Sequence, residues 1–172
     1  DPKNLSALNS LGRIYHEKRN TEKAEKFFLD ALKINDLSFH VINNIAGFYR
    51  EEGKNDKATE YYKKAILLNP NNPYIYNNLS KTYFDLHKHN EAKQNSFKAL
   101  ELKPDDGDIQ KTLSFIYLKE HDYENGWDYF DGRLNLKEFI KKNENIERLN
   151  KKLFRKKVLN NSKSKFLVVR EQ

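Results

Sequence analysis

The feature that most constrains the fold of this 172-residue chain is a spacing of 34 residues between successive tyrosines. The four tyrosines in this register are Tyr15, Tyr49, Tyr83 and Tyr117. Small residues follow the same period, at Ala24, Ala58, Ala92 and Gly126. A fixed period of about 20–50 residues is typical of chains that stack one supersecondary unit several times. The sequence therefore predicts four successive units of the same kind.

Each unit is predicted to hold two helices. In the first unit Leu8, Leu11 and Tyr15 recur at helical spacing, and Ala24 and Phe28 begin a second run with the same spacing. The break between the two runs falls near residues 18–20. A single helical pair cannot bury its apolar face alone, so we expect neighbouring pairs to stack.

Prolines and polar residues predict where these helices begin and end. Pro70 and Pro104 cannot continue a helix, so the second helices of units two and three should end before them. Pro73 should open the next helix, because the first helical position needs no N–H. Thr21 and Asp56 are expected to cap two of the second helices, since their side-chain oxygens can accept from backbone N–H groups.

The pattern of Leu-Gly, Tyr, Ala, aromatic, Ala and Pro resembles the tetratricopeptide repeat (TPR) family, from residue 5 to about residue 134. The resemblance implies an all-α fold: a right-handed superhelical solenoid of helix-turn-helix repeats with a C-terminal capping helix. We place the repeats at 5–38, 39–72, 73–106 and 107–140. The last repeat is degenerate, with Gly126 and Arg133 at alanine places, and Ser96 at an aromatic place should weaken the third. Pro2 matches the proline of a preceding repeat, which we expect upstream.

The formal net charge of +7 is concentrated at the C-terminal end. Residues 135–172 hold 12 lysines and arginines against 4 glutamates, whereas the other residues carry 20 basic and 21 acidic groups. We expect residues 141–163 to form a helical cap or linker. Phe154 is the only aromatic near the basic clusters of that segment, too few for nucleic-acid stacking, so nucleic acid is not expected as a partner. No run of eighteen apolar residues predicts a membrane span.

The C-terminal part also carries a second resemblance. Residues 123–134, with Gly126, Trp127 and Arg133, resemble the last repeat of bacterial proteins in which TPRs precede a glycosyltransferase-like domain. Residues 164–172 resemble the first strand of that domain, truncated before its glycine-rich loop. The resemblance implies that the chain is the acceptor-recognition part of a glycosyltransferase whose catalytic domain lies after Gln172. The alternative is an ordinary short strand or tail.

Ligand contacts in such arrays come from fixed places on the first helix of each repeat. The TPR resemblance therefore implies a peptide-binding groove whose candidate residues are Asn43, Asn44, Asn77, Asn78, Arg13, Arg50, Lys81 and Lys111. Each asparagine offers two donors and an acceptor that can match a peptide backbone without requiring a particular sequence. Asn44 and Asn78 also match the asparagine ladder of O-linked N-acetylglucosamine transferase repeats. The alternative is that these asparagines are simply polar surface residues of an Asn-rich chain.

No catalytic, metal-binding or cofactor motif accompanies these repeats. His87 and His89 lie in a turn without a carboxylate or cysteine at ligand spacing. The chain has no cysteine, which is compatible with a reducing compartment, and we expect a cytoplasmic location. We therefore predict a scaffold that binds a protein or peptide partner, without enzymatic activity of its own. Self-association through an exposed end of the repeat array is a third interpretation.

Overall fold

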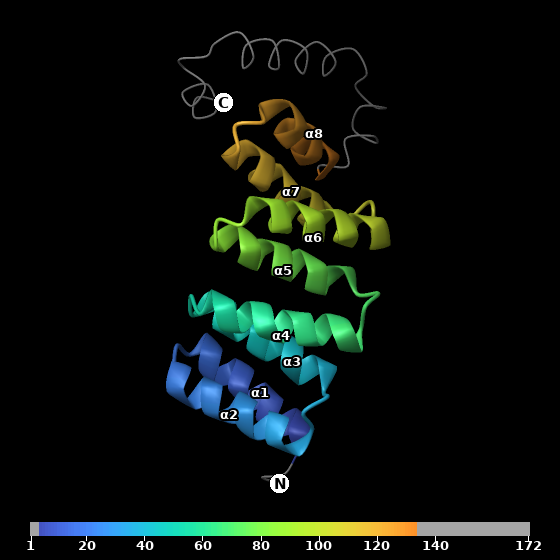
Figure 1. Ribbon diagram of the computed structural model, residues 1–172. Coiled ribbons are helices and arrows are strands. Elements are labelled where there is room, and N and C mark those ends of the chain that lie inside the picture. Colours follow the sequence, from blue (N-terminus) through green and yellow to red (C-terminus); the bar gives the residue numbers. More distant parts are fainter. Residues whose placement is uncertain (1–3, 134–172) are drawn as a thin grey trace, which may run out of the picture. The chain divides into compact units, whose positions relative to one another are not determined.

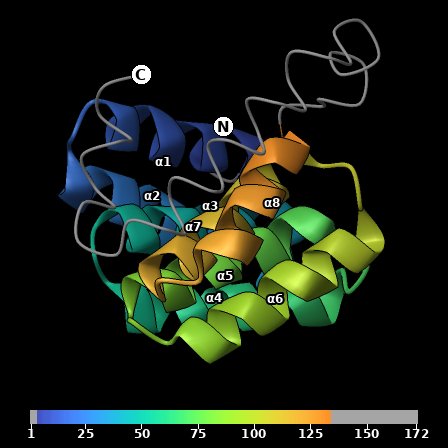
Figure 2. The same cartoon turned by 90° about the horizontal axis from the view of Figure 1, so that it is seen from above.

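The computed structural model describes residues 4–133, and every regular element in this range is an α-helix (Figure 1, Figure 2). The predicted all-α class is therefore confirmed. Four expectations lie outside the described residues: the upstream proline Pro2, the end of the fourth repeat, the cap over 141–163 and the strand over 164–172.

The helices begin at intervals of 34 residues in two series. The first helices of the pairs are α1 (Leu5–Glu17), α3 (Phe39–Glu51), α5 (Pro73–Asp85) and α7 (Gly107–Lys119). The second helices are α2 (Thr21–Ile34), α4 (Asn55–Leu68), α6 (His89–Leu102) and α8 (Tyr123–Arg133). The chain divides into two compact units, one up to Pro104 with α1–α6 and one from Asp105 with α7 and α8.

In the first unit, each pair packs against the next. α1 contacts α2, α3 contacts α4 and α5 contacts α6, while α2 and α4 also contact the first helix of the following pair (Figure 1). The first helices α1, α3 and α5 contact one another in order, so they form a continuous layer within this unit. The alanines of the 34-residue register are fully buried: Ala24, Ala58 and Ala92. Their small side chains let the helix axes approach closely.

A glycine in α1 makes room for an aromatic ring in α2. A Cβ added to Gly12 would lie 2.7 Å from two carbons of the Phe28 ring, closer than real Cβ contacts. Phe28 is 1% exposed and belongs to the core. The ring therefore occupies the volume that any other residue at position 12 would need.

The third pair has polar residues at the two places where the first pair has a glycine and an aromatic ring. Ser80 and Ser96 stand at the places of Gly12 and Phe28 and are both fully buried. Their hydroxyl oxygens lie 2.7 Å apart, and the Ser80 hydroxyl also lies 2.7 Å from the carbonyl oxygen of Ala92. Since a buried hydroxyl without a partner is costly, this pairing satisfies the two hydroxyls that stand in place of a glycine and an aromatic ring. That Ser96 weakens the packing of the third repeat stays a prediction.

Two register tyrosines of the first unit stack on a ring from the second helix of their own pair. Tyr15 stacks on Phe27 with ring centroids 5.3 Å apart, and Tyr49 stacks on Tyr61 at 5.5 Å. Offset ring stacking adds to the stabilisation from apolar burial. The Tyr49 hydroxyl also donates to the Glu25 carboxylate at 2.9 Å. Burial, together with the neighbouring Glu25 carboxylate, raises the pKa of Tyr49.

The turn inside each pair contains one residue with a left-handed backbone. These residues are Arg19 (φ 58°), Gly53 (φ 72°), His87 (φ 58°) and His121 (φ 65°). The amide of the following residue bonds to the carbonyl of the register tyrosine, for example Asn20 to Tyr15 at 2.9 Å and Lys88 to Tyr83 at 2.9 Å. The 34-residue period therefore extends to the backbone of the turns.

The predicted caps of the second helices are wrong by one or two residues. Thr21 is the first residue of α2, and the cap is Asn20, whose side chain accepts from the Lys23 amide at 3.1 Å. Asp56 lies in the first turn of α4, where Lys54 occupies the cap position without a side-chain bond. The left-handed residue in the turn fixes the cap position immediately after itself, which places it ahead of both predicted residues.

The proline predictions agree with the structure. α4 ends at Leu68 and α6 at Leu102, each two residues before a proline. The residue before a proline is driven out of the helical region by the proline ring, which accounts for this offset. Pro73 is the first residue of α5, and Asn72 caps this helix by accepting from the Tyr74 amide at 3.0 Å.

The second unit holds α7 and α8. Tyr117 stacks on Tyr129 with ring centroids 5.8 Å apart, as the register tyrosines do in the first two pairs. Gly126 is buried, and a Cβ added to it would lie 2.7 Å from a methyl carbon of Leu118. The glycine at this alanine place therefore accommodates a large side chain from α7.

Candidate functional site

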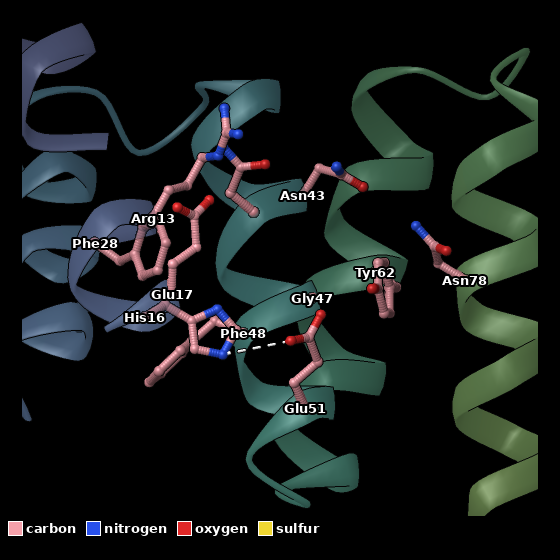
Figure 3. Close-up of a pocket in the computed structure, with 11 residues that line it drawn as sticks. Arg13, His16, Glu17, Phe28, Asn43, Gly47, Phe48, Glu51, Tyr62 and Asn78 are labelled. Carbon is pink, nitrogen blue, oxygen red and sulfur yellow. Dashed lines mark ion pairs between the residues drawn. The ribbon is translucent and has the colours of Figure 1, made fainter. Parts of the chain in front are cut away.

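A pocket of about 290 Å³ opens on the layer formed by α1, α3 and α5 of the first unit. Figure 3 shows it from the side of the first helices, with α3 between α1 and α5. Its lining comes from five helices and consists of Arg13, His16, Glu17, Phe28, Asn43, Asn44, Gly47, Phe48, Glu51, Tyr62 and Asn78. The second helices α2 and α4 contribute one aromatic residue each, and the other residues come from the first helices.

The pocket exists because α3 lacks a side chain at Gly47. The equivalent places hold Arg13 in α1 and Lys81 in α5, both long side chains. A Cβ added to Gly47 would have one neighbour within 4 Å, the Tyr62 hydroxyl oxygen at 3.6 Å. A glycine in a helix interior costs about 1 kcal/mol relative to alanine. Gly47 thus opens the surface of α3 down to Tyr62.

The floor of the pocket is aromatic. Phe28, Phe48 and Tyr62 belong to the lining and are each 1% exposed, so their rings are almost fully covered by neighbouring atoms (Figure 3). Burial raises the pKa of Tyr62 to about 12, against the opposing effect of the nearby Arg50 guanidinium. Tyr62 therefore stays a neutral hydroxyl at physiological pH and can both donate and accept a hydrogen bond.

Amide side chains form the walls. Asn43 and Asn44 come from α3 and Asn78 from α5, and all three are half-buried. The Asn44 amide nitrogen donates to the Asn9 side-chain oxygen at 3.0 Å, which links α3 to α1. An asparagine amide has two N–H donors and one carbonyl acceptor, so this bond uses one donor of Asn44.

The rim carries charges of both signs. The ring nitrogen Nε2 of His16 lies 3.5 Å from the Glu51 carboxylate and 3.7 Å from that of Glu52, and the His16 ring meets Phe48 edge-on (Figure 3). Glu52 also accepts a hydrogen bond from the Thr21 hydroxyl at 2.9 Å. Within residues 4–133, Arg13 and Glu17 have no ion-pair partner. The pocket is therefore polar and charged at its edge and aromatic at its base.

Two family models match parts of the chain between residues 5 and 106. A family model described as tetratricopeptide repeat matches residues 5–36 and 73–106, and one described as TPR repeat matches residues 48–86. The chain contains tetratricopeptide repeats. The TPR assignment made from the tyrosine and alanine register is therefore confirmed, whereas no comparison shows a glycosyltransferase association. No curated protein sequence matches the chain.

Solved TPR-like structures share the fold at low sequence identity. A crystal structure of MamA is 20% identical, with a TM-score of 0.71 and 83% of each chain covered. The Pseudomonas aeruginosa pilF protein is 22% identical, with a TM-score of 0.71, and covers 78% of this chain and 62% of its own. MamA from Desulfovibrio magneticus RS-1 is 15% identical, with a TM-score of 0.72, and covers 79% and 77%. These likenesses support the TPR fold alone.

The structure brings four of the eight predicted groove residues together. Arg13, Asn43, Asn44 and Asn78 all line the pocket. They lie on three consecutive TPR first helices, so a ligand extended across this layer could reach all of them. Their assignment as ligand contacts stays a prediction.

The other four predicted residues are placed differently. Asn77 is 1% exposed, so the surrounding residues cover it and it cannot contact a ligand in the groove without moving. The Arg50 guanidinium lies 3.7 Å from the Asp85 carboxylate, which ties α3 to α5 beside the pocket. Lys81 is half-buried on α5 outside the pocket lining. Lys111 belongs to α7 in the second unit, with its ammonium 5.7 Å from the centre of the Phe115 ring.

Sequence reasoning missed the residues that shape the pocket. Gly47, Glu17, Glu51 and Tyr62 line it, although none was predicted as a groove residue. One signal was available: a glycine within a first helix, at a TPR place where the neighbouring repeats carry long basic side chains. The importance of Tyr62 could not be seen in the sequence, since it becomes part of the pocket only beneath Gly47.

Within residues 4–133, no group of three or more histidines, aspartates and glutamates could hold a metal ion. The His87 and His89 rings lie 6.2 Å apart, and His89 also contacts the Phe84 ring. In the same range, no helix has the length and apolar character needed to cross a membrane.

Proposed function

We propose that the layer of α1, α3 and α5 binds an extended segment of a partner protein. TPR arrays use their first-helix surface for protein recognition, because stacked repeats form an elongated concave face. The observation that supports this use here is the pocket with Asn43, Asn44 and Asn78 along its walls.

Amides suit the recognition of a peptide backbone. Main-chain N–H and C=O groups need partners when a ligand covers them, and an asparagine side chain can satisfy either kind. Asn44 and Asn78 stand at the same place in successive TPRs, so they can contact a peptide at two points along its length. A micromolar affinity, about −8 kcal/mol, would be ordinary for such a site.

The experiment uses peptides selected by the whole 172-residue chain from a random linear 12-mer phage library. A selected peptide is synthesised with a fluorophore, and its dissociation constant is measured by fluorescence anisotropy. The double variant Asn44→Ala, Asn78→Ala should weaken binding roughly tenfold or more, because it removes two hydrogen-bonding amides worth about 1 kcal/mol each. Its melting temperature should fall only slightly, because both side chains are half-buried, although the variant also loses the hydrogen bond between Asn44 and Asn9.

The matched control is Asn71→Ala, Asn90→Ala. Asn71 lies in the turn before α5 and Asn90 in α6, and both are exposed and outside the pocket. This control should bind the peptide as the wild type does. Equal affinity in the wild type and the Asn44, Asn78 double variant would refute the groove assignment.

The rival function, acceptor recognition for a glycosyltransferase, is supported by the sequence resemblance alone. The reading frame after Gln172 tests it directly. A Gly-Leu-Gly-Asp continuation would support a transferase domain, and a stop codon would remove this interpretation. Peptide binding by the groove is compatible with either result.

A further inference from the structure

The pocket over Gly47 is small. Its volume of about 290 Å³ lies just below the range of small-molecule pockets, which hold about 300–1,000 Å³. It lies in the middle of the proposed groove, bounded by α1 on one side and α5 on the other (Figure 3). A segment that crosses the groove could therefore place a single large side chain into it.

The lining chemistry selects among the side chains that would fit. Phe28, Phe48 and Tyr62 line the base of the pocket but are each 1% exposed, so the open part of the lining is mainly polar. Above the rings, the oxygens of Asn43 and Asn78 can accept hydrogen bonds. A purely apolar side chain would leave these amides covered and unpaired, which is costly.

The charged groups at the rim decide whether the pocket favours a cationic or an anionic side chain. Two carboxylates, those of Glu17 and Glu51, line the pocket against one guanidinium, that of Arg13. The imidazole of His16 lies against Glu51 and Glu52. An acidic side chain in this pocket would meet Arg13 but also both carboxylates, and like charges at short range repel.

Charged groups just outside the lining do not reverse this balance. The Arg50 guanidinium is paired with the Asp85 carboxylate at 3.7 Å. Lys81 on α5 takes part in an interaction of its own and lies outside the lining. The carboxylates that face the pocket therefore exceed the cations that face it by one with His16 neutral.

We propose that this pocket binds one arginine side chain of the partner segment, with lysine as a weaker occupant. The guanidinium donates to the asparagine oxygens and to the carboxylates of Glu17 and Glu51. Arginine is favoured because it presents five N–H donors in a flat, fixed arrangement that can reach several oxygens, whereas lysine is a compact charge with three donors. This inference rests on the proposed function and names the chemistry of one anchor in the bound segment.

The test uses blocked pentapeptides of sequence acetyl-Gly-Ala-Xaa-Ala-Gly-amide, with Arg, Lys, Gln or Glu at the centre. Each is titrated into the ¹⁵N-labelled 172-residue chain while amide signals are followed by NMR. The arginine peptide should shift the signals of Gly47, Asn43 and Asn78 most, and bind at least tenfold more tightly than the glutamate peptide. The affinity of the lysine peptide should lie between the affinities of the arginine and glutamine peptides.

Two variants separate charge from shape. Glu17→Gln, Glu51→Gln keeps the side-chain volumes but removes both charges, so the preference for arginine over glutamine should fall at least threefold. Gly47→Leu fills the pocket and should abolish the shifts of Asn43 and Asn78. The charge control is Glu22→Gln, Glu91→Gln, which alters exposed carboxylates on α2 and α6 and should leave the preference unchanged.

The outcomes distinguish this inference from the function it rests on. Equal or tighter binding of the glutamate peptide, or pocket signals unmoved by the arginine peptide, would overturn the arginine site. If library-selected peptides then still bound in a way that depended on Asn44 and Asn78, the groove function would stand without this anchor. If binding of the library-selected peptides did not depend on Asn44 and Asn78 either, both the arginine site and the groove function would be refuted.

Discussion

Gly12 in α1 and Gly47 in α3 differ in what an added methyl group would meet. At Gly12 a Cβ would lie 2.7 Å from ring carbons of Phe28, which is 1% exposed. At Gly47 it would meet the Tyr62 hydroxyl at 3.6 Å, an ordinary contact distance. The first glycine is needed for packing, whereas the second leaves space that the fold does not require.

This difference predicts opposite effects of the same substitution. Gly12→Ala should lower the free energy of unfolding by about 1–3 kcal/mol, because the buried ring must shift to admit the methyl group. Gly47→Ala should leave the stability unchanged or raise it by up to about 1 kcal/mol, since alanine is the better helix former. Urea unfolding followed by circular dichroism measures both values.

The pair carries its own control, because both variants change glycine to alanine within a helix of the same length. If Gly12→Ala proved as stable as Gly47→Ala, the close approach of α1 and α2 at Phe28 would be wrong.

Residues of the candidate site could be predicted from the sequence only in part. The TPR place of Arg13, Asn43, Asn44 and Asn78 identified them as facing the groove, and all four line the pocket. Asn77 occupies the same place as Asn43 yet is buried. The exposure of a residue depends on the side chains of the neighbouring helices that pack around it. The spacing of residues along one repeat does not show which side chains these are.

Among the helices, the four turns inside the pairs share one backbone geometry but differ in their caps. Asn20 accepts from the Lys23 amide, and Asp122 accepts from the Asn125 amide at 3.2 Å. Lys54 and Lys88 hold the equivalent positions and make no side-chain cap bond. The backbone at Lys88 (φ −89°, ψ 71°) is nearly that of Asn20 (φ −95°, ψ 77°).

Lys88→Asn should therefore stabilise the chain. The new side chain can accept from an unpaired amide in the first turn of α6, worth about 1 kcal/mol. The reciprocal variant Asn20→Ala should lose a similar amount at α2. Both changes are measured as shifts in the urea midpoint, and failure of Asn20→Ala to destabilise would contradict the capping account.

The positions of the helices followed from the sequence more fully than their caps. The 34-residue register of tyrosine and alanine fixed the apolar faces of the helices, and the prolines fixed the ends of α4 and α6. The caps depended on a left-handed residue in each turn, which Arg19 and His87 supply although glycine is favoured there. The residue types in these turns do not show that geometry.

Over the whole chain, the proposed binding function belongs to the first unit. Its layer of α1, α3 and α5 carries the pocket, the asparagines and the charged rim. The expected cap over 141–163 and the transferase-like strand over 164–172 lie outside the described residues. The sequence predicted the scaffold, but the pocket over Gly47 is lined by residues of five helices, which no single repeat reveals.

The most direct test of the central claim is a crystal structure of the 172-residue chain bound to a library-selected peptide. We predict an extended peptide that runs across α1, α3 and α5, contacts Asn44 and Asn78, and covers Gly47. A peptide bound instead against the outer faces of α2, α4 and α6, with the pocket over Gly47 left open, would contradict it.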